Sequence, residues 1–148
     1  MASKLQRRGR HTVLPIIGDT LAELRLSAAR APALGFQAPD GSESEITVHD
    51  GIALRRGDCD LMLPDSEADA MHPMSLSPLL ELIGSTVTDA IAEETGRLQI
   101  EFSNKLVLSV CPTGGSEAWH FQFPRPGRPA GGDVSQCVSV IGTHGRLI

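Results

Sequence analysis

Aromatic residues are scarce in this sequence. They make up 3% of the 148 positions, as four Phe, one Trp and no Tyr. A folded core must therefore be packed mainly by aliphatic side chains. β-Sheet proteins that bind RNA usually present exposed aromatic residues, and the formal net charge here is −5, so we expect no nucleic-acid partner.

Cysteines are also few, and their number is odd. Cys59, Cys111 and Cys137 are widely spaced and include no C-x-x-C pair. The sequence therefore indicates neither a disulfide framework nor a standard zinc motif. This usage is typical of a reducing compartment, and we expect a cytoplasmic protein with no cofactor.

Long apolar runs are missing as well. The run VLPII at residues 13–17 is interrupted by a glycine and an aspartate. A secretory segment needs an apolar stretch of roughly 7–15 residues, and a membrane-spanning helix needs about 20. We therefore expect no signal peptide and no membrane partner.

Positive charge is concentrated at the N-terminus. Lys4, Arg7, Arg8 and Arg10 lie within the first eleven residues, which contain no acid, whereas all 18 Asp and Glu residues lie in the remainder. A short charged stretch of this kind is typical of a solvated terminus. We expect residues 1–11 to form a disordered basic tail on an acidic body.

The chain contains an internal repeat. LPIIGDTL at residues 14–21 is matched by LELIGSTV at residues 80–87. In the same alignment, LGF (34–36) falls on IEF (100–102), ITV (46–48) on LSV (108–110) after a gap, and IAL (52–54) on AWH (118–120). We predict two repeats, residues 14–57 and 80–123, followed by a C-terminal hairpin over residues 134–148.

Both repeats have the pattern of β-structure. RLQIEF and KLVLSV alternate with a period of two, and Asp40-Gly41 and Ser103-Asn104 are typical of hairpin turns. TLAELRLSAA and TVTDAIAEE also suit helices, but their position in the repeat favours strands. SLSPLLELIG predicts either a short helix or an extended lead-in.

We therefore predict a mainly β fold, with α+β as the alternative. Residues 12–148 form a single domain in which two tandem antiparallel β-meander repeats pack as one sandwich or barrel-like unit, with at most short helices.

The segments IGSTV, LQIEFSNKLVLSV, SEAWHF and VIGTHGRL resemble a small, largely uncharacterised bacterial family. Its members share a Gly-x-x-Val lead-in, two strands joined by an aromatic residue and turn residues, a Glu-Ala-Trp motif and a closing Gly-containing hairpin. The resemblance covers roughly residues 14–148 and departs at Asn104-Lys105, where the family tends to have Asp-Gly. It implies a small cytoplasmic β-rich protein without known catalytic residues, similar to immunity proteins encoded beside polymorphic toxins.

The most acidic stretch is a candidate partner-binding site. Asp58, Asp60, Asp65, Glu67 and Asp69 follow one another without a compensating base. The stretch is either a solvated connector between the repeats or a loop that faces a basic partner, because complementary charge accelerates association. Calcium is disfavoured, since the spacing of a calcium-binding loop and its closing Glu are missing.

A second candidate contact is the edge formed by Glu117, Trp119 and His120. Alternation along an extended strand places Glu117 and Trp119 on one face and Ala118 and His120 on the other. We interpret Trp119 as either a core residue or an anchor for a partner.

No catalytic residue is predicted. Cys59 lies between two aspartates that disfavour its thiolate, and Ser116 lacks the G-x-S-x-G pattern of an acyl-transfer nucleophile.

The function predicted first is a non-enzymatic protein-binding module, of the immunity type, that occludes the active site of a basic toxin domain. One alternative is a metal-binding module or small metal-dependent enzyme that uses Cys111, His120, Cys137 and His144. The other is a self-associating structural domain, for example a homodimer, in which exposed edge strands pair between copies.

Overall fold

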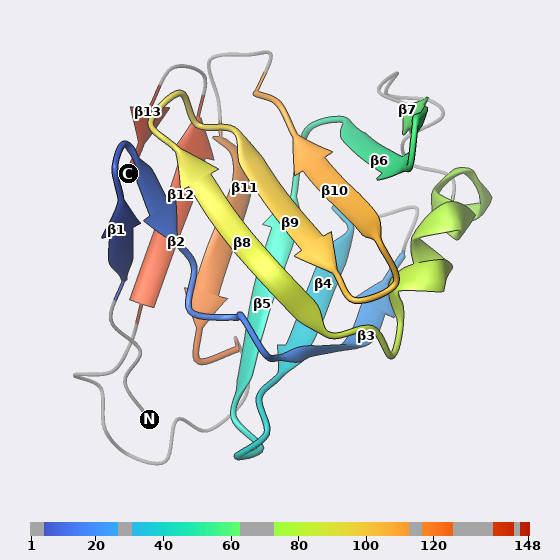
Figure 1. The fold of residues 1–148 in the computed structure, drawn as a ribbon, viewed down its shortest axis with the longest axis horizontal. Helices are drawn as coiled ribbons and strands as arrows, with labels where there is room; N and C mark the ends of the chain where they lie inside the picture. The colour runs from blue at the N-terminus through green and yellow to red at the C-terminus, as the bar shows by residue number, and fades with distance from the viewer. Residues whose placement is uncertain (1–4, 27–30, 63–72, 113–116, 126–137, 144–145) are drawn as a thin grey trace.

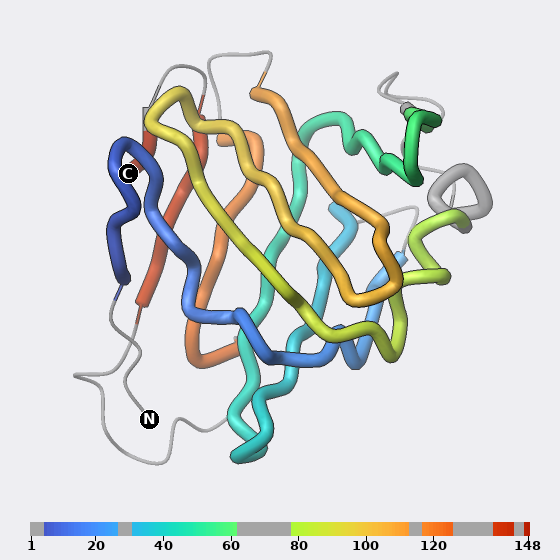
Figure 2. The backbone as a smooth tube through the Cα atoms, in the orientation of Figure 1, coloured from blue at the N-terminus to red at the C-terminus, as the bar shows by residue number. Residues whose placement is uncertain are grey.

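The computed structural model describes residues 5–26, 31–62, 73–112, 117–125, 138–143 and 146–148 (Figures 1 and 2). The strands are β1 (Gln6–Arg8), β2 (His11–Val13), β3 (Thr20–Arg25), β4 (Ala33–Gln37), β5 (Glu43–Val48), β6 (Ile52–Arg56), β7 (Cys59–Met62), β8 (Val87–Glu93), β9 (Leu98–Phe102), β10 (Leu106–Val110), β11 (Glu117–Phe123), β12 (Val138–Thr143) and β13 (Arg146–Leu147). A 3-10 helix, η1 (Pro73–Leu82), precedes β8.

The strands form two antiparallel sheets that pack face to face (Figure 1). In the described residues, the first sheet has the order β1-β2-β8-β9-β10-β6-β7, and the second has the order β13-β12-β11-β5-β4-β3. The mainly β prediction is confirmed, and the architecture is a sandwich, not a closed barrel. TLAELR and VTDAIAE are strands because each places buried side chains against the opposite sheet.

The two predicted repeats are present, and they exchange their fourth strands. In the first repeat, β3, β4 and β5 form a meander in one sheet, and β6 then crosses to pair with β10 of the other sheet. In the second repeat, β8, β9 and β10 form the equivalent meander, and β11 crosses back to pair with β5. Each sheet is therefore completed by a strand from the other repeat.

The two copies of the repeated phrase meet where the sheets cross. Thr20 forms a bridge with its counterpart Thr86. The flanking hydrogen bonds are duplicated in the same way: Leu21 N donates to Ser85 O (3.0 Å), and Val87 N donates to Asp19 O (2.8 Å).

Glycine is needed at the same position of both copies of the phrase. Gly18 and Gly84 have φ of +93° and +89°, a region that residues with a Cβ rarely adopt. Each donates its N–H across the junction, to Val87 O and Leu21 O respectively. The repeated glycine therefore has the same structural role in both repeats: it adopts a positive φ and donates a hydrogen bond to the other repeat.

One part of the predicted alignment is wrong by one residue. The register pairs Val110 with Ile52 and the equivalent Val48 with Trp119, so Ile52 corresponds to Trp119 and not to Ala118. A β-bulge between Glu117 and Trp119 accommodates the one additional residue that β11 has relative to the predicted alignment. The shift puts the large side chain of Trp119 into the core position that Ile52 occupies in the first repeat.

The expected disordered tail is also corrected. Residues 6–8 and 11–13 form the antiparallel hairpin β1–β2, which extends the first sheet beyond β8. Exposed ion pairs join Arg7 to Glu94 (3.0 Å) and Arg8 to Asp89 (3.2 Å). Arg7 and Arg8 remain exposed, but they belong to a hairpin and pair with acidic residues of β8 and of the turn that follows it. Residues 1–4 lie outside the described part of the chain.

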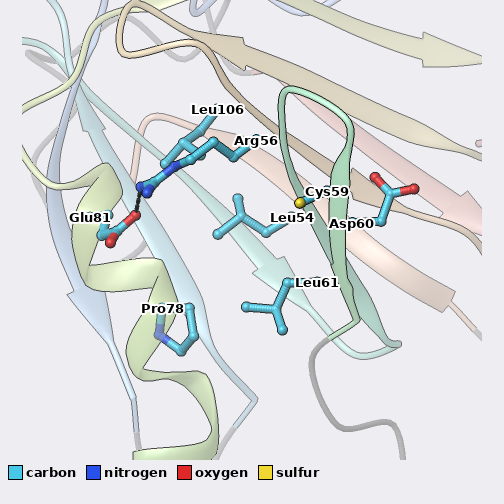
Figure 3. A pocket seen from close by; sticks show the side chains of 8 residues that line it. All are labelled: Leu54, Arg56, Cys59, Asp60, Leu61, Pro78, Glu81 and Leu106. Atoms are coloured by element: carbon cyan, nitrogen blue, oxygen red, sulfur yellow. Dashed lines mark hydrogen bonds and ion pairs between the residues drawn. The ribbon is translucent and has the colours of Figure 1, made fainter.

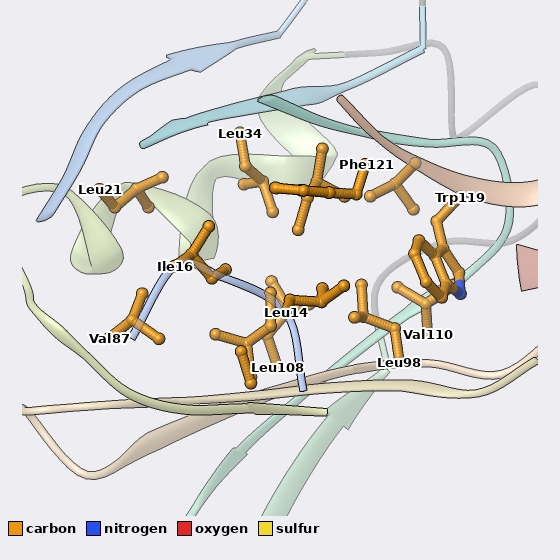
Figure 4. Packing of buried hydrophobic residues seen from close by; sticks show 14 of the residues in the cluster. Leu14, Ile16, Leu21, Leu34, Val87, Leu98, Leu108, Val110, Trp119 and Phe121 are labelled. Atoms are coloured by element: carbon orange, nitrogen blue, oxygen red, sulfur yellow. The ribbon is translucent and has the colours of Figure 1, made fainter. Parts of the chain in front are cut away.

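Aliphatic side chains fill the space between the sheets, together with Trp119, Phe36, Phe102 and Phe121 (Figure 4). The Trp119 ring is fully buried, and its Nε1 donates to Gly96 O at 2.7 Å. At the C-terminus, β12 and β13 pair as a hairpin, while residues 134–137 of the predicted hairpin lie outside the described residues. In the part of the chain that is described, no helix has the length and apolar character required to cross a membrane.

Candidate functional site

A pocket of about 590 Å³ opens at one end of the sandwich, between the β6–β7 hairpin and η1 (Figure 3). We call it the β6–β7 pocket. It is lined by Leu54, Arg56, Cys59, Asp60, Leu61, Pro78, Glu81 and Leu106. Leu54 and Leu106 are buried and form its floor, and Pro78 contributes the wall on the η1 side.

The sequence dictates which β6–β7 side chains reach this pocket. Gly57 and Asp58 form a two-residue hairpin turn, with φ of +59° at Gly57, and so Arg56 stands opposite Cys59 and Leu54 opposite Leu61. Strand alternation then places Leu54, Arg56, Cys59 and Leu61 on the face of the hairpin that lines the pocket. Asp60 lies on the opposite face of β7, as Figure 3 shows.

The rim of the pocket is polar and mostly exposed. Arg56 forms an ion pair with Glu81 of η1, drawn as a dashed line in Figure 3. The Asn104 side chain donates to Glu81 O at 3.1 Å and so fastens the end of η1 to the β9–β10 turn. These contacts hold one wall of the pocket in place, whereas Leu61 on the other wall is 47% exposed.

Two of the five predicted acidic residues lie beside this pocket. Asp58 is exposed at the tip of the β6–β7 turn, and Asp60 is exposed on β7. Asp60 makes a long ion pair, at 3.7 Å, with Arg55, which precedes the acidic stretch in the sequence. Asp65, Glu67 and Asp69 lie outside the described residues, in the segment that connects β7 to η1.

The second predicted contact, over residues 117–120, is not an edge of the sheet. β11 lies between β5 and β12, and Trp119 is fully buried, so its side chain packs the core and reaches no partner. Glu117 pairs with His49 at 3.1 Å, and His120 Nε2 lies 2.6 Å from Ser139 Oγ. The prediction that Glu117 and Trp119 share one face of the strand is wrong, because the bulge before Trp119 interrupts the alternation of side chains.

The structure describes two of the four residues of the alternative metal site, Cys111 and His120, and it places them in different sheets. Cys111 follows β10 in one sheet, whereas His120 lies on β11 of the other. Within the described residues, no group of three or more His, Cys, Asp and Glu side chains is arranged to hold a metal ion. Cys137 and His144 lie outside the described residues.

A charged group that the sequence did not predict lies on the outer face of the second sheet. Arg125 is 8% exposed; its Nη1 donates to Glu23 (2.8 Å) and its Nε to Glu45 (3.0 Å). Hydrogen bonds to Glu23 and Glu45 raise the pKa of Arg125 above its ordinary value. Gly35 leaves room for the guanidinium, since a Cβ there would lie 2.9 Å from Arg125 Nη1.

This Arg125 group acts as a structural clamp, because its donors are engaged by carboxylates within the chain. The pairing of Gly35 with Glu45 could have been predicted from the sequence, because the position of the Asp40-Gly41 turn fixes the register of the two strands that it joins. Arg125 arrives from a distant part of the chain, and no local pattern in the sequence indicates it.

The protein is an antiparallel β-sandwich in which two meander repeats exchange strands and share one core, with a pocket at one end. The chain matches, over residues 13–135, the family described as a family of unknown function, DUF6188. It belongs to this family, and the match takes in both repeats. No curated protein and no solved structure matches the chain.

Proposed function

We propose that this protein is a non-enzymatic protein-binding module of the immunity type, which captures a basic partner domain and covers its active site. The feature that carries the proposal is the β6–β7 pocket, whose apolar floor adjoins the hairpin where the most acidic stretch of the sequence begins. Residues 55–69 contain five acidic residues and two arginines. Neither the charge nor the apolar surface requires chemistry by the protein itself.

The two kinds of surface have different roles in binding. The acidic side chains of this stretch raise the rate at which a basic partner arrives, and this effect weakens as salt screens the charges. Leu54, Leu61 and Leu106 provide the apolar contact that a long-lived complex needs, since buried apolar groups dominate the centre of most interfaces.

The first test is protection. The protein is co-expressed with each toxin-like protein encoded beside its gene, growth is measured, and the purified pair is assayed for inhibition. We expect growth to be restored and the partner's activity to be blocked at a one-to-one ratio. If none of these proteins is bound or inhibited, the proposed function is wrong.

The second test is electrostatic. The triple charge reversal Asp65→Lys, Glu67→Lys and Asp69→Lys should slow association with a basic partner by about tenfold or more at low salt, and the difference should shrink at high salt. Glu94→Lys is the control for reversal of an exposed acid elsewhere, because Glu94 is exposed in the turn after β8, which lies on the opposite side of Figure 1 from β7. Equal rates for the triple variant and the control would remove the acidic segment from the interface.

A further inference from the structure

The internal repeat makes β7 comparable with β12. β6 and β11 are the exchanged fourth strands, and each carries a neighbour on its outer side. Leu61 on β7 stands opposite Leu54, and Val140 on β12 stands opposite Phe121. Leu61 and Val140 therefore occupy equivalent positions in the two sheets.

The two equivalent positions differ in what covers them. β12 pairs on its outer side with β13, through Gly142–Leu147 and Thr143–Arg146, and Val140 is 4% exposed. In the described part of the chain, β7 pairs only with β6, and Leu61 is 47% exposed above the β6–β7 pocket. Within the described residues, the second sheet thus has a covering strand where the first sheet has an open edge beside the pocket.

We infer that this open edge of β7 accepts an extended segment of the protein partner as an added strand, which takes the part that β13 takes for β12. The inference deepens the proposed function, on which it rests, by naming how the partner is held. Main-chain hydrogen bonds to an edge strand supply affinity in such complexes, and alternate side chains supply specificity.

The side chains of β7 indicate the chemistry of the added segment. Cys59 and Leu61 face the pocket, whereas Asp60 faces outward. A strand paired with β7 presents its side chains to the same two faces in alternation. The segment that fits has apolar residues that enter the pocket and basic residues that pair with Asp60, which suits a basic partner.

The hairpin register shows which backbone groups are available. Arg56 and Cys59 flank the two-residue turn and form a hydrogen-bonded pair, and antiparallel pairs alternate. Arg55 and Asp60 are therefore a non-hydrogen-bonded pair, and the N–H and C=O of Asp60 point away from β6 toward the open edge. A proline at position 60 removes the outward N–H without removing a bond to β6.

The probe is a fluorescent peptide, acetyl-Lys-Val-Lys-Val-Lys-Val-Lys-amide, titrated with the purified full chain in an anisotropy assay. We expect saturable binding to the wild type. Asp60→Pro should weaken binding at least tenfold relative to Asp60→Asn, which removes the same charge and keeps the N–H. Leu61→Glu, at a half-exposed position, should weaken it as well. Circular dichroism verifies that each variant is folded.

N-Methylated peptides test the backbone directly. Methyl groups on one alternate set of amides should abolish binding, and methyl groups on the other set should leave it within twofold, because only one edge of the peptide faces β7. The inference is overturned if the wild type does not bind the peptide, if both methylated peptides bind equally, or if Asp60→Pro binds as well as Asp60→Asn.

Two other occupants of the edge would give distinct results. A wild-type dimer in sedimentation that Asp60→Pro converts to monomer would assign the edge to a second copy. Peptide binding that occurs only after residues 63–72 are replaced by a glycine-serine linker would assign it to the chain's own segment. Either result overturns the inference, and inhibition of a partner without peptide binding would leave the proposed function standing.

Discussion

At the scale of single residues, Trp119 and Gly142 form the tightest fit in the core. They stand opposite each other on β11 and β12, and the indole lies where a Cβ on residue 142 would be. Gly96 O accepts the indole N–H and also closes this space, at 2.7 Å from the same Cβ position. Neither neighbour can move without loss of a buried hydrogen bond.

We expect Gly142→Ala to lower the free energy of unfolding by about 2–3 kcal/mol, because overpacking forces side chains off their preferred conformations. Urea denaturation measures the change. In a double-mutant cycle with Trp119→Leu, which frees the space, the added methyl should cost much less. A single-variant change within about 0.5 kcal/mol of zero would contradict the tight fit.

The pKa of the Asp19 carboxyl is raised well above its ordinary value. The side chain is 8% exposed beside the crossing of the sheets, and burial, followed by the charge of Asp40, raises its pKa from 3.8 to about 6. The folded state therefore holds this proton more tightly than the unfolded state. Its stabilising contribution is complete below pH 4 and is lost as the pH rises through 6.

Asp19→Asn removes this dependence. We expect the variant to be more stable than the wild type at pH 7, by up to about 3 kcal/mol, and the difference to shrink as the pH falls to 4. Urea midpoints of both proteins between pH 4 and pH 7 measure it. A difference that stays constant over this range would show that Asp19 does not titrate as described.

At the scale of elements, the β9–β10 hairpin contains the only described residue other than glycine with a positive φ. Lys105 has φ of +73°, and its N–H donates to Phe102 O to close the turn. Three-residue hairpin loops place a left-handed residue at this point, usually glycine. The departure from Asp-Gly noted in the sequence at Asn104-Lys105 thus falls on a strained position.

Lys105→Gly should stabilise the protein by about 0.5–1 kcal/mol, because it relieves the strain of the left-handed conformation. Thermal or urea denaturation provides the measurement. The matched control is Gly41→Lys in the β4–β5 turn, where φ is +91°, and this change should destabilise the protein. A lower stability for Lys105→Gly would mean that other contacts of the lysine outweigh the strain.

At the scale of the whole molecule, the exchange of fourth strands makes each repeat incomplete alone. Without β11, β5 becomes an open edge, and without β6, β10 becomes an open edge. The single core receives side chains from both repeats, as Figure 4 shows for Leu14, Leu34, Leu98 and Leu108. Neither half therefore keeps a closed apolar interior when separated from the other.

Cleavage of the chain tests this dependence. Residues 1–66 and residues 67–148, expressed separately, should each be unfolded as monomers, whereas an equimolar mixture should recover the circular dichroism and amide spectra of the intact protein. The intact chain with a protease site at the same point is the control. A dispersed amide spectrum from either monomeric half would contradict the shared core.

Much of the fold followed from local patterns. The period-two alternation, the Asp40-Gly41 turn and the repeated Ile-Gly phrase predicted strands, hairpins and two repeats, and these are present because each depends on neighbouring residues in the chain. The register of β11 and the order of the N-terminal strands were missed, since both depend on contacts between residues more than 60 positions apart.

The candidate site divides in the same way. The acidic residues around the β6–β7 turn, Asp58 and Asp60, were identified from the sequence because charge is a property of composition. The apolar floor, the Arg56–Glu81 pair and the open edge of β7 were not, since Leu54, Glu81 and Leu106 come from three elements that only folding brings together.

The sequence by itself determined that this protein is a duplicated, mainly β chain with an acidic stretch between its repeats, because alternation, turn residues and charge act over short distances. Only the tertiary structure decided that the repeats exchange strands, that Trp119 is core, and that β7 is an edge strand beside a pocket among the described residues. The physical reason is that these features are pairings between distant segments, and their selection depends on how much apolar surface the whole core buries.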